Sequence, residues 1–259
     1  MAAKQHDHQP ETPSYGRYPS EIDGHAAWVS VSVDWMREPD ARKTNWLHVR
    51  FPYSPALGDG LPSDKAIAMI DQAEDLIVAL LEDKLKAEHV GSVSAAGMRH
   101  VYFYAPSDRG LADALRLVPA QVPTCNPSAM SRVDKEHKLF EQTLEPDLAQ
   151  FEFMKNAWVL EQLSEHGDKH AAEHRIEHYA YFPTVDARTQ FIAGLVEGEY
   201  EVEEEFAEER DGAKAYGVRF THSGPIEIFE LSDRTSELAG NAMELDGEYE
   251  GWETEPVTG

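Results

Sequence analysis

The sequence RIEHYAYFPT, at residues 175–184, decides the fold of the C-terminal half of the chain. Its apolar and polar residues alternate with a period of two, which predicts a half-buried strand over residues 175–182. Pro183 then interrupts the strand, and Thr184 can cap a helix that runs to about Glu197. This change of period marks the start of a β-α unit.

The residues after this unit predict two more strands, a second helix and a final strand. Apolar residues alternate over residues 200–206 and 216–220, and Asp211-Gly212 between them is a strong hairpin signal. Residues 226–245 show helical spacing, and residues 248–254 form a last short strand. The order β-α-β-β-α-β predicts a ferredoxin-like domain over residues 175–259.

Upstream, residues 147–174 are expected to form a connecting helix and linker, because a helical pattern from about residue 147 ends at Gly167. Alternation predicts strands over residues 28–35, 47–53, 90–95 and 99–105, and helices are expected at 64–86, 108–117 and 137–144. The order β-β-α-β-β-α indicates a sandwich domain over residues 25–146. Residues 1–24, rich in His, Pro, Ser and Tyr, are expected to be a disordered arm. The predicted class is α+β, with two α/β sandwich domains.

The formal net charge of the 259-residue chain is −25, and it is concentrated in the C-terminal half. Residues 147–259 contain 27 acidic and 8 basic side chains. No direct nucleic-acid binding is expected, because phosphate binding needs clustered Lys and Arg. A basic protein segment would be attracted and steered. The alternative interpretation is that the charge only keeps the protein soluble.

The sequence predicts a cytoplasmic protein without membrane association, disulfides or cofactor. No apolar run approaches the ~18 residues that span a membrane, and the start lacks the layout of a secretory signal. Cys125 is the only cysteine, which fits a reducing compartment. The oligomeric state stays open.

Four histidines spaced four residues apart raise a weaker alternative, a metal-binding protein or metal-dependent hydrolase. They are His166, His170, His174 and His178, of which the last three are the candidate ligands. However, Gly167 breaks the helix within the pattern and His178 falls on the predicted strand. The four are therefore expected not to share a face, and no metal site is predicted.

Acidic and aromatic residues of the C-terminal domain are the candidate contacts for a partner. Glu203, Glu204 and Glu205 form a dense run that is either a solvated strand edge or a docking surface. Tyr249 and Trp252 lie near the C-terminal end of the sequence and have acidic neighbours. Trp252 either packs the last strand onto the helices or anchors an Arg-rich segment through cation–π contacts.

The C-terminal domain resembles the RraB family, regulators of ribonuclease E activity. The matching residues are the HYAYFPT stretch from His178 to Thr184, which includes Phe182, and the EYEGW ending at residues 248–252. Residues 28–146 resemble the DUF-695 family, of unknown function, in the loop from Tyr53 to Pro62, the strand over 99–105 and the helix near 138–144.

The RraB resemblance implies a bacterial, non-enzymatic protein that binds a basic, poorly ordered region of ribonuclease E and lowers its activity. The residues expected to bind the partner are His178, Phe182, Glu203, Glu204, Glu205, Tyr249 and Trp252. RraB proteins proper have a single domain and often a long acidic tail, whereas this chain has a second domain and a short tail. The transferable expectation is the fold and the partner-binding role.

Overall fold

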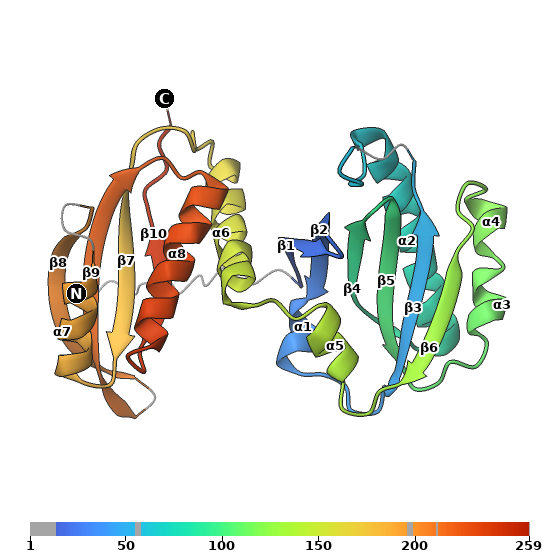
Figure 1. Ribbon diagram of the computed structural model, residues 1–259, viewed down its shortest axis with the longest axis horizontal. Helices are drawn as coiled ribbons and strands as arrows, with labels where there is room; N and C mark the ends of the chain where they lie inside the picture. The colour runs from blue at the N-terminus through green and yellow to red at the C-terminus, as the bar shows by residue number, and fades with distance from the viewer. Residues whose placement is uncertain (1–13, 55–57, 196–198, 211, 259) are drawn as a thin grey trace, which may run out of the picture. The chain divides into compact units, whose positions relative to one another are not determined.

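The computed structural model describes residues 14–54, 58–195, 199–210 and 212–258. The chain divides into two compact units, Met1–Glu145 and Pro146–Gly259, and each contains its own sheet (Figure 1). This architecture confirms the predicted α+β class with two domains. Across the described ranges, no helix is both long and apolar enough to cross a membrane.

The N-terminal unit is built on a six-stranded antiparallel sheet in the order β1-β2-β4-β5-β3-β6. Ile70, Ile77 and Leu81 recur at helical spacing on α2 and pack with β3 and β5 in the core. The strands are β1 (Tyr15–Ile22), β2 (His25–Ser32), β3 (Asn45–Pro52), β4 (Glu88–Ala95), β5 (Met98–Ala105) and β6 (Ser128–Val133). The helices are α1 (Val33–Arg37), α2 (Asp64–Leu85), α3 (Leu111–Leu115), α4 (Val118–Gln121) and α5 (Lys138–Thr143).

The predicted disordered arm is wrong for residues 15–22, which form β1 and pair with β2 along the whole strand. Tyr18 holds this strand in place, because its buried hydroxyl donates a hydrogen bond of 2.7 Å to the Leu144 carbonyl. Pro19 is compatible with an edge strand, where a missing N–H leaves no ladder partner unpaired. Residues 1–13 of the predicted arm lie outside the described residues.

Two further segments of the N-terminal unit differ from the prediction. The strand expected over residues 28–35 ends at Ser32, whose hydroxyl oxygen accepts a hydrogen bond from the Trp35 amide and caps α1. Strand β6 was not predicted, because its side chains are mostly exposed and show no alternation of buried and exposed positions.

The C-terminal unit contains a four-stranded antiparallel sheet in the order β10-β7-β9-β8, which is the ferredoxin-like order predicted from the sequence. Helices α7 and α8 pack on one face of this sheet (Figure 1), where Phe191 and Leu238 meet Phe182 and Phe220 in the core. The elements are β7 (His174–Phe182), α7 (Val185–Gly194), β8 (Glu201–Arg210), β9 (Ala213–Gly224), α8 (Ile228–Met243) and β10 (Glu248–Glu253). Asp211 of the predicted hairpin turn and residues 196–198 lie outside the described residues.

Helix α6 (Leu148–Glu165), expected as a connector, is part of the C-terminal unit. The buried Asn156 side chain donates hydrogen bonds to Ser232 and Thr235 of α8, at 3.1 and 2.8 Å. Its carbonyl oxygen accepts a hydrogen bond of 2.7 Å from the indole N–H of Trp252 on β10. This polar network joins three elements, so α6 is held by the fold.

Candidate functional site

The four regularly spaced histidines do not form one stripe, although His170 and His174 both lie within 4 Å of the Asp168 carboxylate, at 3.8 and 2.9 Å. His166 lies at the end of α6, His170 lies in the following loop, and His174 and His178 lie on β7. The side chain of His174 is buried against Asp168, with 2.9 Å between Nε2 and Oδ2. Within the ranges that the structure describes, no group of three or more His, Cys, Asp or Glu side chains could hold a metal ion.

His178 lies in the core of the C-terminal unit. Its Nδ1 is 2.7 Å from the Tyr249 hydroxyl and its Nε2 is 2.7 Å from Nδ1 of His222. Burial and the neighbouring His222 lower the pKa of His178 to about 3. The prediction that His178, Phe182 and Tyr249 contact a partner is wrong for this structure, because each is at most 5% exposed.

Trp252 is half-buried and packs beside a core cluster that includes Leu160, Ile176 and Ile226. Its indole N–H is directed at Asn156 of α6. Of the two interpretations left open by the sequence, this geometry supports packing of the last strand. Trp252 therefore stabilises the fold and is not an exposed anchor for a partner.

The Glu203–Glu205 run divides between the two faces of the sheet. Glu205 forms an ion pair of 2.6 Å with Arg188 of α7, on the helix-covered side. Glu203 and Glu204 pair with Arg175 and Arg219, whose strand positions alternate with the buried ones. A register shift between residues 202 and 204 places these two adjacent glutamates on the same side.

The face of the C-terminal sheet that points away from α7 and α8, called the outer sheet face below, is rich in glutamate. The strand registers place eight glutamates and three arginines on it. The negative charge therefore exceeds the positive charge by a wide margin. The glutamates are Glu177, Glu201, Glu203, Glu204, Glu208, Glu248, Glu250 and Glu253, and the arginines are Arg175, Arg210 and Arg219.

Each arginine of the outer sheet face is held by carboxylates. Arg175 pairs with Glu177 at 2.5 Å and with Glu203 at 2.7 Å. Arg219 lies 3.4 Å from both Glu177 and Glu204. The face therefore already binds guanidinium groups from its own strands, and its remaining carboxylates are available to other cations.

Aromatic rings cross the same face. Gly217 leaves room on β9, so the Phe206 ring of β8 reaches the Tyr181 ring of β7 edge-on, with 5.7 Å between centroids. The Arg210 guanidinium lies over Tyr181, 3.9 Å from the ring centroid, and pairs with Glu250 at 2.9 Å. Burial, followed by the neighbouring Glu250 carboxylate, raises the pKa of Tyr181 to about 12, so this ring stays neutral.

The N-terminal unit matches a known protein family over enough of the chain to assign the protein to it. Residues 14–145, just over half of the chain, match the model of the family of unknown function DUF695. The chain belongs to the DUF695 family. In this DUF695 protein, residues 154–254 match a second family model, the regulator of ribonuclease activity B, RraB. Both matches agree with the resemblances found in the sequence.

No curated protein matches the sequence. Two solved structures are similar to the DUF695 protein at 10% identity and a TM-score of 0.23, each covering 83% of this chain and 99% of its own. One is an unknown protein from Galdieria sulphuraria, and the other is a provisionally assigned glycine cleavage system transcriptional repressor. At these TM-scores, neither similarity informs the fold or the function.

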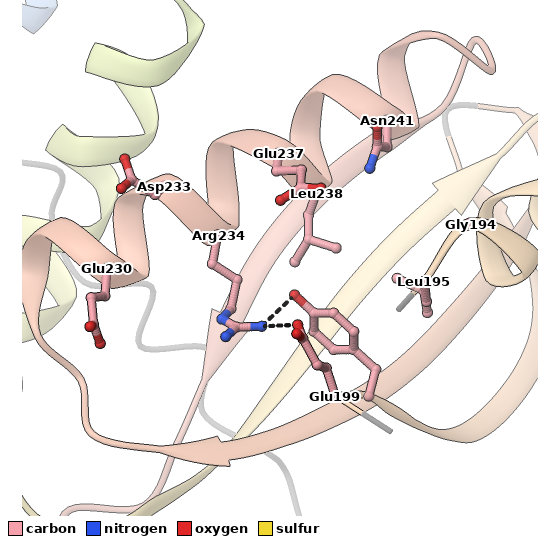
Figure 2. A pocket seen from close by; sticks show the side chains of 10 residues that line it. Gly194, Leu195, Glu199, Glu230, Asp233, Arg234, Glu237, Leu238 and Asn241 are labelled. Atoms are coloured by element: carbon pink, nitrogen blue, oxygen red, sulfur yellow. Dashed lines mark hydrogen bonds and ion pairs between the residues drawn. The ribbon is translucent and has the colours of Figure 1, made fainter. Parts of the chain in front are cut away.

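The RraB-like unit of this DUF695 protein has a second acidic feature, a hollow of about 390 Å³ beside α8 (Figure 2). Arg234 lies within it and donates hydrogen bonds to the Tyr200 hydroxyl at 2.9 Å and to Glu199 at 3.4 Å. This hollow has a smaller excess of negative charge than the outer sheet face. Its other acidic lining residues are Glu230, Asp233 and Glu237.

We expect Gly217→Ala to displace the Phe206 ring while leaving the fold intact. A Cβ at this position would lie 2.4 Å from the tip of that ring, which is the movable end of a half-buried side chain. The free energy of unfolding should therefore fall by only about 1 kcal/mol. Urea unfolding measures this loss, and the aromatic NMR signals of Phe206 and Tyr181 report the ring displacement. Unchanged ring signals would contradict the packing described here.

Proposed function

We propose that this DUF695 protein is a cytoplasmic, non-enzymatic regulator whose RraB-like unit binds a basic segment of a ribonuclease of the ribonuclease E type. One observation carries the proposal: the unit that matches a family of ribonuclease regulators presents a sheet face with eight glutamates around three arginines. Proteins that bind basic segments use this chemistry, because fixed carboxylates attract and orient Lys and Arg.

The same face disfavours direct binding of RNA. A surface with excess carboxylates repels the phosphate backbone, and phosphate contacts supply most of the affinity of RNA-binding proteins. Regulation would therefore act through the ribonuclease and not through its substrate. The partner segment should be extended and rich in Arg or Lys, as poorly ordered regions often are.

The chemistry of Cys125 argues against a role for this residue as a catalytic nucleophile. The residue is buried, and burial raises the pKa of its thiol to about 11. A nucleophilic cysteine needs the opposite, a lowered pKa in an electropositive setting. Cys125 is packed with the core of the N-terminal unit, and it fits the role of a small apolar residue.

The proposal predicts that salt slows association of the full-length protein with the basic region of a ribonuclease E type enzyme. Raising the salt concentration from ~50 to ~300 mM should lower the association rate constant about tenfold, because charges steer the encounter and the screening length falls from roughly 14 Å to roughly 6 Å. The dissociation rate should change much less, since it reports short-range contacts. Stopped-flow fluorescence measures both rates.

Charge-neutralising variants locate the binding face in the same experiment. Glu203→Gln, Glu204→Gln and Glu208→Gln together should reproduce the effect of salt on the association rate. Glu230→Gln and Glu237→Gln, with Asp233→Asn, form the matched control, because they remove the same charge from α8. An association rate that is changed neither by salt nor by the three substitutions in β8 would overturn the proposal. The acidic charge would then serve only to keep the protein soluble.

A further inference from the structure

On the outer sheet face, one guanidinium group of the protein stacks on an aromatic ring beside a carboxylate. The Arg210 guanidinium lies over the Tyr181 ring at 3.9 Å and pairs with Glu250 at 2.9 Å. The three residues come from three strands, β8, β7 and β10. A flat ring with a carboxylate beside it matches the planar, cationic guanidinium group.

Arg210 differs from Tyr181 in its place on its strand. It is the last residue of β8 and lies next to the predicted hairpin turn, and its side chain is 29% exposed. The ring is held on both sides, whereas the Glu250 side chain is 48% exposed and lies at a register shift in β10. Tyr181 lies within β7 between two paired strands and touches Phe206, and Glu250 lies on β10.

The charges around this position favour an additional cation. Glu250 and Glu208 both act electrostatically on Tyr181, and Glu248 acts on Arg210. Removal of Arg210 would therefore leave a ring surrounded by carboxylates with no positive charge of its own. A second arginine could then bind in the same place with the same contacts.

We propose that Tyr181 and Glu250 form an arginine-binding slot, that Arg210 occupies it in the free protein, and that an arginine of the basic partner displaces Arg210. This inference rests on the proposed function and specifies the partner as arginine-rich rather than lysine-rich. Lysine fits the slot less well, because its compact, strongly hydrated ammonium cannot stack on the ring as a guanidinium does. Arg210 thus competes with the partner's arginine for the slot and lowers the affinity of the protein for its partner.

The test compares two synthetic peptides of about ten residues, in which glycine alternates with arginine in one and with lysine in the other. Fluorescence anisotropy at low salt measures their affinity for the full-length protein. The wild type should bind the arginine peptide about threefold more tightly. Arg210→Ala should raise that preference to about tenfold, because the slot is then empty.

Two further variants distinguish arginine binding in the slot from a general effect of charge on peptide affinity. Arg175→Ala removes one positive charge from the same face and should strengthen both peptides by the same factor. Tyr181→Leu retains an apolar side chain but removes the stacking ring, so it should abolish the preference for arginine. Circular dichroism checks that each variant is folded.

The outcomes distinguish the two proposals. Failure of both peptides to bind any of these proteins would overturn the proposed function and the slot with it. Binding of both peptides with equal affinity, unchanged in ratio by Arg210→Ala, would overturn the slot alone. A preference for arginine that survives Tyr181→Leu would also overturn it.

Discussion

Replacing Trp252 with alanine is expected to lower the free energy of unfolding of the C-terminal unit by about 3–4 kcal/mol. The indole packs beside the cluster of Leu160, Ile176 and Ile226, and its loss leaves a cavity between α6 and the sheet. The change also removes the indole N–H that donates a hydrogen bond to the carbonyl oxygen of the buried Asn156 side chain. Differential scanning calorimetry of the full chain measures the shift in the transition of this unit.

Trp252→Phe divides this loss into its two parts. The phenyl ring keeps most of the packing, so only the hydrogen bond to Asn156 is lost, at a cost of about 1–2 kcal/mol. Trp28→Ala serves as the control, since Trp28 is 39% exposed and belongs to the other unit. Near-native stability of Trp252→Ala, combined with weakened partner binding, would restore the interpretation of Trp252 as an exposed anchor.

Acid is expected to destabilise the C-terminal unit through His178, by on the order of 3 kcal/mol between pH 7 and pH 4. Burial and His222 hold the pKa of the folded residue at about 3, whereas a histidine in an unfolded chain titrates near pH ~6.5. Between these values the unfolded chain binds a proton that the folded chain does not. Stability contributed by the neutral imidazole is therefore complete above pH ~6.5 and is lost as the pH falls.

The variant His178→Gln isolates this contribution from the titration of the many carboxylates. Urea unfolding at several pH values gives the dependence of the unfolding free energy on pH for each protein. The wild type should lose stability more steeply below pH ~6 than the variant, by the equivalent of about one proton taken up on unfolding. Parallel curves for the two proteins would show that His178 is not buried and neutral in the folded state.

The architecture of the C-terminal unit could be predicted from the sequence because its local signals agree with one another. The alternation in RIEHYAYF, the Thr184 cap and the helical spacing after residue 226 each define one element. Strand β1 was missed for the opposite reason. Its composition is typical of a loop, and it becomes a strand through pairing with β2 and a hydrogen bond from Tyr18 to residue 144, which is distant in sequence.

The candidate site was predicted only in part, because its geometry depends on register between strands. The acidic run was found, but a bulge at residues 202–204 separates Glu205 from its two neighbours. The alternation that buries His178 and Phe182 also places Tyr179 and Tyr181 on the opposite face, and that signal was available in the sequence. The contact of Arg210 with Tyr181 could not be predicted from the sequence, because it joins residues from different strands.

Hydroxyl-radical footprinting can show directly whether the outer sheet face binds a basic segment. The full-length protein is oxidised with and without the basic region of a ribonuclease E type enzyme, and oxidation of individual aromatic side chains is measured by mass spectrometry. We expect Tyr181 and Phe206 to be protected, while Tyr200 in the hollow and Phe229 on α8 react as before. Protection of Tyr200 and Phe229 without protection of Tyr181 and Phe206 would show that the partner binds at the helices and not at the outer sheet face.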